Sequence, residues 1–323
     1  MDQGILQTLR QVKKTISTPT YTNPSTLTLV RENLAPEVTR LVNRETPLRD
    51  RLSRVQGNGP AASWNVLTSI TNNNAAFAEG TTPTENNASY ERRSAVYKEL
   101  GKKKSITDRM LAAGASFMDQ EAEQTEVAML EVIQDEERLI IQGDLGSNPL
   151  EFDGLDQLIT TNVTNDANNA LGWRTDLIDA EIANLMTNYG VKPTAIYVSY
   201  GMKRAINQSL AGDVRVNIDS TNQVGHGVDV TFYQSAIGKL PIIATFAIPE
   251  DTTTYPGNTV SDMYIVTEQA FGQQNIYLSE LYPLGKSMLD RTGAAINFMV
   301  TESLVLVVRG EELCSKVTNI RIA

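Results

Sequence analysis

Histidine and cysteine are almost absent from this sequence of 323 residues, which contains one of each, His226 and Cys314. A Ser-His-Asp or Cys-His triad, or a histidine-built metal site, would have to use His226, which lies between two glycines. The usual zinc sites need several Cys and His ligands and are excluded. One cysteine cannot form an internal disulfide, and its apolar surroundings predict that Cys314 is a small buried side chain.

Long apolar runs are also missing. No stretch approaches the ~20 apolar residues that a transmembrane helix requires. The amino terminus, MDQGILQTLRQVKK, has no apolar core followed by a small-residue cleavage site. We therefore expect no membrane contact and no signal peptide, and a protein that stays in the cytoplasm where it is made. An apolar content of 41% indicates a folded chain, large enough for two or more lobes.

Motifs for phosphate, dinucleotide and calcium binding are lacking too. There is no G-x-x-x-x-G-K-S/T loop, and the GHG triplet around His226 is too short for a dinucleotide fingerprint. Asp166, Asn168 and Gly172 resemble part of a calcium loop, but the glycine is misplaced and the terminal Glu is missing. No aromatic-basic motif predicts recognition of nucleic acid, and the pI near 4.8 opposes it. We expect no cofactor and no metal.

Residues 57–104 form a stretch that cannot bury a core of its own. Alternating residues from Trp64 to Ile70 predict a half-buried strand, and a second extended segment returns after a polar tip. The tip, residues 71–89, has Phe77 as its only large apolar side chain. Isolated two-stranded hairpins are marginal in water, so we expect this arm to be ordered on a neighbouring subunit. The alternative is a loose surface loop, although loops of this length are uncommon in compact domains.

Charge is divided unevenly along the chain. Residues 1–110 carry 16 Lys and Arg against 10 Asp and Glu, whereas residues 111–323 carry 12 against 28. Ordinary solvated surface would explain this asymmetry by itself. Together with an arm that lacks a core, it favours basic arms that lie on the acidic bodies of other copies. An acidic body would also suit a container for nucleic acid, because its walls would not hold the contents.

The clearest helix is predicted over residues 115–142, where apolar residues recur at spacings of three and four. Eight acids and the single Arg138 in this stretch predict a strongly negative outer face. Its length would be about 40 Å at the usual rise per residue. Gly143 is well placed to end it.

Shorter elements are predicted on both sides of this helix. Proline in the first turn favours helices over residues 36–44 and 47–54, with Thr46 as a possible cap for the second. After the long helix, an α/β portion is predicted, followed mostly by strands. Its expected helices are 176–186 and 202–210, and the expected strands are 195–199, 240–248, 263–267, 276–281, 296–300 and 304–308.

The order of these segments resembles the major capsid proteins of tailed bacteriophages with the Hong Kong 97-type fold. Almost the whole chain fits, including an EFDGL turn at residues 151–155. The strings LYPLGK from Leu281 and VTESLVL from Val300 look like the end of one capsid subfamily. The resemblance implies an α+β fold, the Hong Kong 97-type capsid fold, made of an N-terminal arm (1–56), an extended β-hairpin loop (57–104), a peripheral domain with a long spine helix (105–152), an α/β axial domain (153–275) and a return to the peripheral domain (276–323).

The resemblance also implies a function without catalysis. A major capsid protein of this kind would form hexamers and pentamers in an icosahedral shell around double-stranded DNA, with a scaffold, a portal and possible decoration proteins as partners. It would be assembled in the host cytoplasm and end in the virion capsid. An encapsulin-like compartment that encloses cargo enzymes is the nearest alternative. A hydrolase built on the α/β lobe, with acidic residues as acid and base, is a third hypothesis, which no motif supports.

The residues expected to contact other subunits lie on the arm, on the basic run that closes it or on the acidic helix. They are Trp64, Phe77, Arg92, Arg93, Lys102, Lys103, Lys104, Glu131 and Glu136. Some relatives form Lys-to-Asn crosslinks between subunits. Lys98 and the basic run lie in the corresponding region, with Asn297 or Asn319 as conceivable acceptors, but nothing in the sequence marks them.

Overall fold

A computed structural model describes residues 43–70, 76–82, 85, 87–114, 119–166, 173–211, 231–235, 237–253 and 258–322. The chain divides into two compact units, Met1–Leu41 and Val42–Ala323, and all described residues lie in the second. Several sequence predictions fall outside the described residues. They are most of the N-terminal arm, nearly all of the helix at 36–44, the first four residues of the predicted long helix, and His226.

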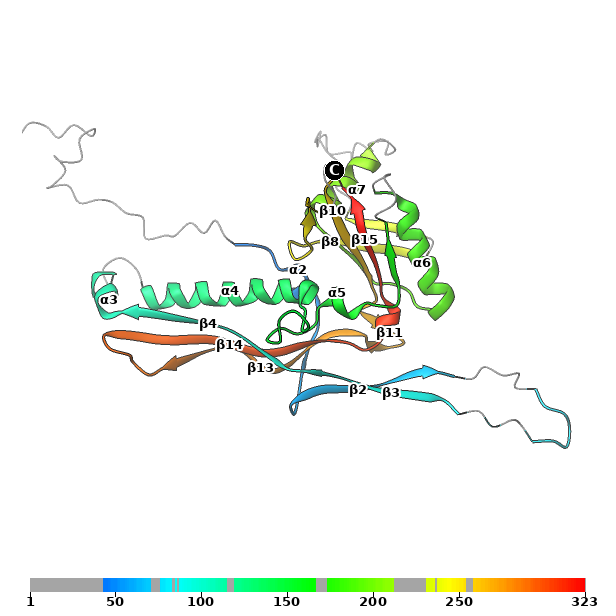
Figure 1. Cartoon of the computed structure of the whole chain (residues 1–323), viewed down its shortest axis with the longest axis horizontal. Coiled ribbons are helices and arrows are strands. Elements are labelled where there is room, and N and C mark those ends of the chain that lie inside the picture. Colours follow the sequence, from blue (N-terminus) through cyan, green and yellow to red (C-terminus); the bar gives the residue numbers. More distant parts are fainter. Residues whose placement is uncertain are drawn as a thin grey trace, which may run out of the picture. The chain divides into compact units, whose positions relative to one another are not determined.

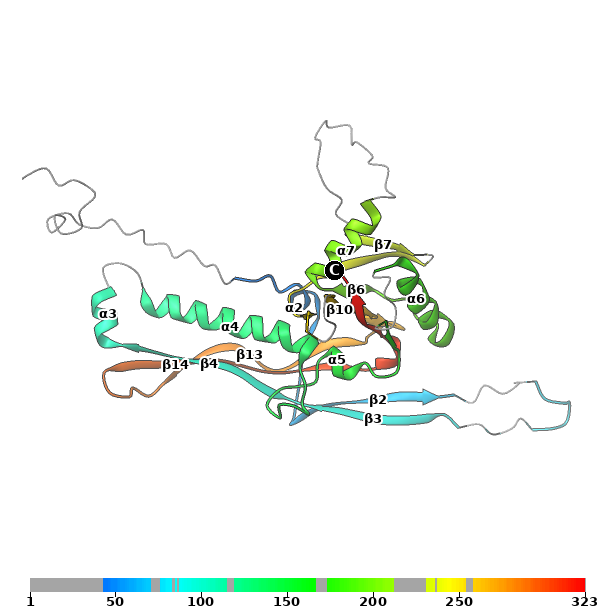
Figure 2. The same ribbon diagram turned by 45° about the horizontal axis from the view of Figure 1, so that its top comes forward.

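A four-stranded sheet and a long helix form one part of the fold (Figure 1). The strands lie in the order β1, β13, β14, β4; β1 is parallel to β13 and the other neighbours are antiparallel. Helix α4 runs along this sheet in both views (Figures 1 and 2). The elements are α2 (Pro47–Arg51), β1 (Arg54–Gln56), β4 (Lys98–Thr107), α3 (Asp108–Gly114), α4 (Gln120–Gln142), β13 (Ile276–Leu289) and β14 (Ala295–Val308).

Helix α4 is the predicted spine helix. Its amino end is capped by Asp119, whose carboxylate accepts hydrogen bonds from two backbone N–H groups of the first turn. Its apolar face packs on the sheet, where Val132 and Phe298 belong to one buried cluster. Gly143 follows the last turn as expected, and a Cβ there would lie 2.1 Å from the carbonyl oxygen of Phe152. Only glycine fits this approach.

A second, larger sheet with helices forms the predicted α/β portion. Its strands lie in the order β5, β15, β10, β6, β8, β7, and β9 pairs with β10. Apolar side chains of α6 and α7 join those of β6, β8 and β10 in one buried core, which includes Leu185, Ile196 and Met202. The elements are α5 (Leu155–Leu158), β5 (Val163–Asn165), α6 (Thr175–Tyr189), β6 (Ala195–Val198), α7 (Tyr200–Ala211), β7 (Phe232–Ser235), β8 (Gly238–Ala244), β9 (Glu250–Asp251), β10 (Val260–Val266), η2 (Glu311–Leu313) and β15 (Ser315–Arg321).

The arm is a two-stranded antiparallel hairpin, as predicted. Strand β2 (Ala61–Ser69) pairs with β3 (Ser89–Val96), and the hairpin projects away from the sheet that α4 covers (Figures 1 and 2). The arm is shorter than predicted at its second strand, which leaves the hairpin after Val96. Lys98 begins β4, which pairs with β14, so the basic run belongs to the four-stranded sheet.

The carboxyl-terminal strands also differ from the predictions. The sequence predicts two strands over 296–300 and 304–308, but β14 is continuous, because Glu302 between them stays in register with Leu100 of β4. The last strand does not return to the spine-helix layer. β15 pairs with β10 in the larger sheet, so the predicted return of all residues after 276 is wrong for this strand.

Candidate assembly surfaces

The base of the arm is fixed to its own chain. The indole Nε1 of Trp64 donates a hydrogen bond to the carbonyl oxygen of Arg309 at 3.2 Å, and Trp64 packs against the main core. Arg93, opposite Trp64 on β3, pairs with Glu312 at 2.7 Å. Two of the residues predicted to contact other subunits, Trp64 and Arg93, thus have partners within their own subunit. We call this contact the arm base.

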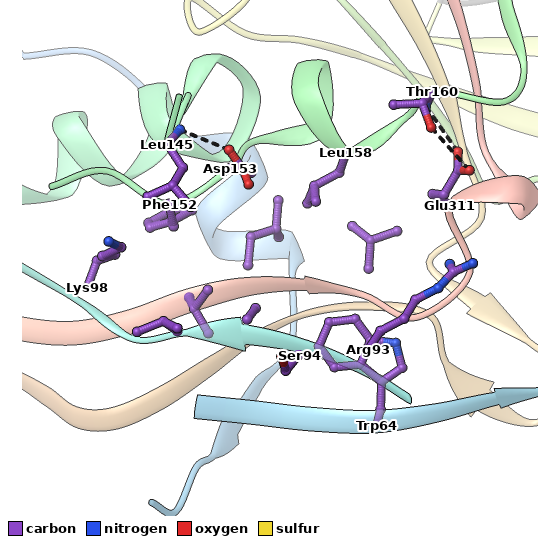
Figure 3. A pocket seen from close by; sticks show the side chains of 15 residues that line it. Trp64, Arg93, Ser94, Lys98, Leu145, Phe152, Asp153, Leu158, Thr160 and Glu311 are labelled. Carbon is purple, nitrogen blue, oxygen red and sulfur yellow. Dashed lines mark hydrogen bonds between the residues drawn. The ribbon is translucent and has the colours of Figure 1, made fainter. Parts of the chain in front are cut away.

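A groove of about 440 Å³ lies beside the arm base. Figure 3 shows Trp64 and Arg93 on one side of it and Phe152 and Leu158 on the other, with Glu311 held by hydrogen bonds from Thr160. Apolar side chains dominate the lining near β14. The groove therefore lies between the arm and the segment after the spine helix, whereas the arm base joins the arm to the residues that follow β14.

The rest of the arm, which we call the distal arm, exposes apolar side chains. Leu67 and Tyr90 face each other across the hairpin and are 46% and 73% exposed, and Ile70 and Phe77 further out are also exposed. Arg92 is exposed on the same face as this cross-strand pair. Trp64 and Val66 are half-buried, but Ile70 is exposed, so the predicted half-buried face holds only for the first half of β2. Contiguous exposed apolar surface is typical of sites that contact other molecules, which makes the pair Leu67 and Tyr90 a candidate contact.

The basic run has partners on the spine helix of the same chain. Lys102 pairs with Asp135 at 2.9 Å and Lys104 with Glu131 at 2.6 Å, because alternate residues of β4 face α4. Lys103 points to the other face and is exposed. Part of the charge complementarity that the sequence suggests between copies is therefore satisfied inside one copy.

Glu136 lies inside the subunit, not on the negative outer face of the spine helix. It is fully buried; its carboxylate pairs with Arg49 at 2.6 Å and also with Arg54. Arg54 reaches Glu280 at 3.3 Å and Glu302 at 3.9 Å. We call these five residues the junction, because they join α2, β1, α4, β13 and β14. In this arrangement the Glu136 carboxylate is not available to another copy.

Glu302 is the least satisfied member of the junction. It is fully buried, and neither carboxylate oxygen has a hydrogen-bond partner among the described residues. Burial is the largest cause that raises the pKa of Glu302, and the charges of Glu136 and Glu280 act in the same direction. Arg54 and Arg49 oppose them, and the pKa that results from all these causes is about 7. At neutral pH this carboxyl group is therefore close to its midpoint of ionisation.

A neighbouring glutamate caps the short helix α2. Thr46 is at the N-cap position, but its side chain makes no capping hydrogen bond, and α2 ends at Arg51 instead of residue 54. The Glu137 carboxylate instead accepts hydrogen bonds from the backbone N–H groups of Leu48 and Arg49, at 3.2 and 2.8 Å. Burial raises the pKa of Glu137. No local sequence signal points to this cap, because Glu137 is 89 residues from Leu48.

The Cys314 thiol and the Asn297 amide, two groups with possible chemical roles, are both buried within the subunit. Cys314 is fully buried, as predicted, and burial raises the pKa of its thiol to about 12. The amide of Asn297, a conceivable crosslink acceptor, is buried and donates to the Asp290 carbonyl at 3.2 Å. Within the described ranges, no group of three or more His, Cys, Asp and Glu could hold a metal ion. No helix in the described part of the chain is long and apolar enough to cross a membrane.

The sequence matches the family described as SU10 major capsid protein over residues 15–321. No curated protein matches it. Among solved structures, the capsid of an empty GTA particle computed with C5 symmetry is similar, with a TM-score of 0.66 at 14% identity, covering 94% of this chain and all of that chain.

Two further structures have the same fold. Mycobacterium phage Ogopogo gives a TM-score of 0.63 at 13% identity, covering 93% of this chain and 99% of that chain. The holo-SrpI encapsulin complex from Synechococcus elongatus PCC 7942 gives 0.63 at 11% identity, covering 94% and 98%.

Proposed function

Because the chain belongs to the SU10 major capsid protein family and has the Hong Kong 97-type fold, we propose that its copies form hexamers and pentamers in an icosahedral shell. The shell encloses double-stranded DNA of a tailed phage without reading its sequence. The proposal assigns the chain no catalytic reaction. Its work is the burial of surface between copies.

The observation that carries this proposal is the contrast along the arm. Trp64 and Arg93 fix the arm base to the body, whereas Leu67 and Tyr90 expose apolar surface. The projecting part of the hairpin does not stabilise its own subunit, since two isolated strands are marginally stable. A neighbouring copy that covers the distal arm would bury this surface and fix the orientation of the arm.

Of the residues predicted to contact other subunits, three are free to do so in the proposed shell. Phe77 and Arg92 lie exposed on the arm, and Lys103 is exposed on β4. We place these three against neighbouring copies. The remaining six have partners within their own subunit, in the arm base, in the pairs between β4 and α4, or in the junction.

Several further partners belong to the proposal. A scaffold and a portal would guide assembly in the host cytoplasm, and decoration proteins would bind the finished virion shell. The predicted domain boundaries at residues 56, 104, 152 and 275 remain proposals, with β15 left out of the segment that returns to the peripheral domain. The acidic body supports a container for DNA, because like charge prevents tight binding to the wall.

The test is to express the chain alone and to examine it by size-exclusion chromatography and negative-stain microscopy. We expect closed shells, hexamers or pentamers. A monomer that stays monomeric at high concentration, also after addition of the phage's scaffold, would contradict the proposal.

The encapsulin likeness supplies a second candidate, a compartment that encloses cargo enzymes. The family match favours a phage capsid instead. The contents of shells from the native source distinguish the two. Nuclease-protected double-stranded DNA supports the capsid, whereas a stoichiometric protein cargo without DNA supports the compartment.

A further inference from the structure

A small separate hairpin that follows β10 carries an aromatic residue where the backbone disfavours one. Strand β11 (Gln269–Ala270) pairs with β12 (Gln273–Gln274) and leaves Phe271 and Gly272 as a two-residue loop. Both loop residues have positive φ, 52° for Phe271 and 78° for Gly272. A loop of this type favours Asn-Gly or Asp-Gly, because a bulky side chain is strained in the left-handed region. We call this element the Phe271 turn.

The Phe271 side chain is little buried within its own subunit. It is 78% exposed, the highest value among the exposed large apolar side chains in the described part of the chain. The sequence therefore accepts backbone strain in order to hold an apolar ring in solvent. A strained backbone conformation that brings no stabilising contact within the subunit points to a function of the Phe271 ring outside the subunit.

The base of the Phe271 turn is rigid. Buried Asn275 donates hydrogen bonds to the carbonyl oxygens of Thr267 and Gly310, at 3.0 and 3.2 Å, and accepts one from the Gly310 N–H at 2.8 Å. Arg309 donates to the side-chain oxygen of Gln273 at 3.1 Å. The aromatic ring is thus presented on a fixed support, which lowers the entropy that a contact would cost.

Beside the turn lies a groove of about 480 Å³ that also borders the arm. Val66 and Leu67 of β2 line it together with Tyr189, Leu313 and Phe271. A molecule that lies on the distal arm at Leu67 therefore also reaches Phe271.

The charged groups at this groove already have partners in their own chain. Glu312 pairs with Arg93 at 2.7 Å, and the Arg309 guanidinium lies 5.2 Å from the centre of the Tyr277 ring. The surface therefore suits an apolar protein contact better than a polyanion.

We propose that the Phe271 turn is an assembly contact, in which a second copy of this chain covers the Phe271 ring and continues along the groove to Leu67. The inference rests on the proposed shell and adds one anchoring residue to it. Rigid exposed aromatics that become buried typically supply much of the energy of an interface. The strain in the free subunit is then offset by the contact in the shell.

The first test uses Phe271→Asn, which suits the turn but removes the ring. We expect the unassembled subunit to melt roughly 1–3 °C higher, because the strain is relieved. We also expect the protein concentration needed for assembly to rise at least about tenfold. Phe271→Tyr is the matched control, since it keeps both the ring and the strain, and it should behave as the wild type in both measurements.

The second test measures burial directly with Phe271→Cys. The native Cys314 is fully buried, so the introduced thiol should supply nearly all the labelling by a maleimide. We expect labelling in shells to be at least about tenfold slower than in unassembled subunits. Wild-type protein supplies the background rate.

The outcomes separate this inference from the proposed function. Failure of the wild type to assemble under any condition overturns the shell itself. Wild-type shells together with unchanged assembly of Phe271→Asn, or equal labelling of Phe271→Cys in both states, overturn only the role of the Phe271 turn.

Discussion

The junction and the distal arm use opposite kinds of side chain. The junction gathers charges inside the subunit, with Arg54 between Glu136, Glu280 and Glu302. The distal arm instead exposes apolar residues such as Tyr90 to solvent. The charge asymmetry, taken together with an arm that lacks a core, predicts that charges pair between copies. In this chain, much of the charge pairing therefore lies inside the subunit, whereas the apolar side chains of the distal arm stay exposed.

The largest expected effect comes from shortening the distal arm. Ser69 and Ser89 lie opposite each other, so residues 70–88 can be replaced by Asn-Gly to close a two-residue turn. We expect the subunit to keep its melting temperature within about 2 °C, because the removed residues lie beyond its core, but to form no closed shells. Size-exclusion chromatography and electron microscopy measure assembly, and circular dichroism measures folding.

A double variant controls for the length of the arm. Ile70→Ser with Phe77→Ser keeps the full hairpin and removes only exposed apolar surface. If this variant assembles as the wild type does while the shortened arm does not, the length of the arm matters and the apolar side chains of Ile70 and Phe77 do not. Unfolding of the shortened variant would show that the arm is part of the subunit's core after all.

The second prediction concerns the junction. Arg54→Ala leaves buried Glu302 without its nearest cation and Glu136 with Arg49 alone. Removal of one partner from a buried ion pair commonly costs about 3 kcal/mol or more, so we expect a loss of that size in the free energy of unfolding. Urea denaturation of unassembled subunits measures it. Arg92→Ala, on the exposed arm, should change stability by less than about 0.5 kcal/mol; a similar loss in both variants would refute the contrast.

The sequence predicts those structural elements that depend on local periodicity. The spine helix and the arm are found because the spacing of apolar residues is visible within short windows. The junction is not, because Arg54 and Glu136 are 82 residues apart in the chain. Glu302 even misleads, since a carboxylate in an apolar run suggests a break between strands, whereas β14 carries it through the sheet.

The same limit applies to the contacts that the sequence assigns to other copies. Lys102 and Lys104 are recognised as a basic run, but only the pairing of β4 with β14 turns them toward α4. Phe271 carries a readable signal, because Phe-Gly between short polar segments is an unusual turn sequence. The structure adds that the Phe271 ring is exposed and that its φ is positive, and the sequence alone predicts neither.

The third prediction sharpens the role of Glu302. Its folded pKa of about 7 lies above the ordinary value of 4.5, so the folded state holds the proton more tightly than the unfolded state does. The stabilising contribution of this proton is complete below pH 4.5 and is lost as pH rises through 7. The shift corresponds to about 3 kcal/mol.

Glu302→Gln removes this dependence. We expect the variant and the wild type to have similar unfolding free energies at pH 5, and the variant to be more stable at pH 8. Taking the difference between the two proteins removes the contribution of groups that titrate independently of residue 302. A constant difference from pH 5 to pH 8 would show that the Glu302 carboxyl group does not titrate in this range.

The smallest effect is expected at the arm base. Trp64→Phe keeps an aromatic ring against the core but removes the hydrogen bond to the Arg309 carbonyl, which should cost about 1 kcal/mol in the free energy of unfolding. Because this bond holds the arm to its own body, hydrogen exchange at the backbone amides of β2 should increase while that of α4 stays unchanged. Trp173→Phe is the control for loss of an indole elsewhere in the chain. Faster exchange throughout the subunit would mean that Trp64 stabilises the whole core, and the distinction between a fixed arm base and an independent distal arm would then fail.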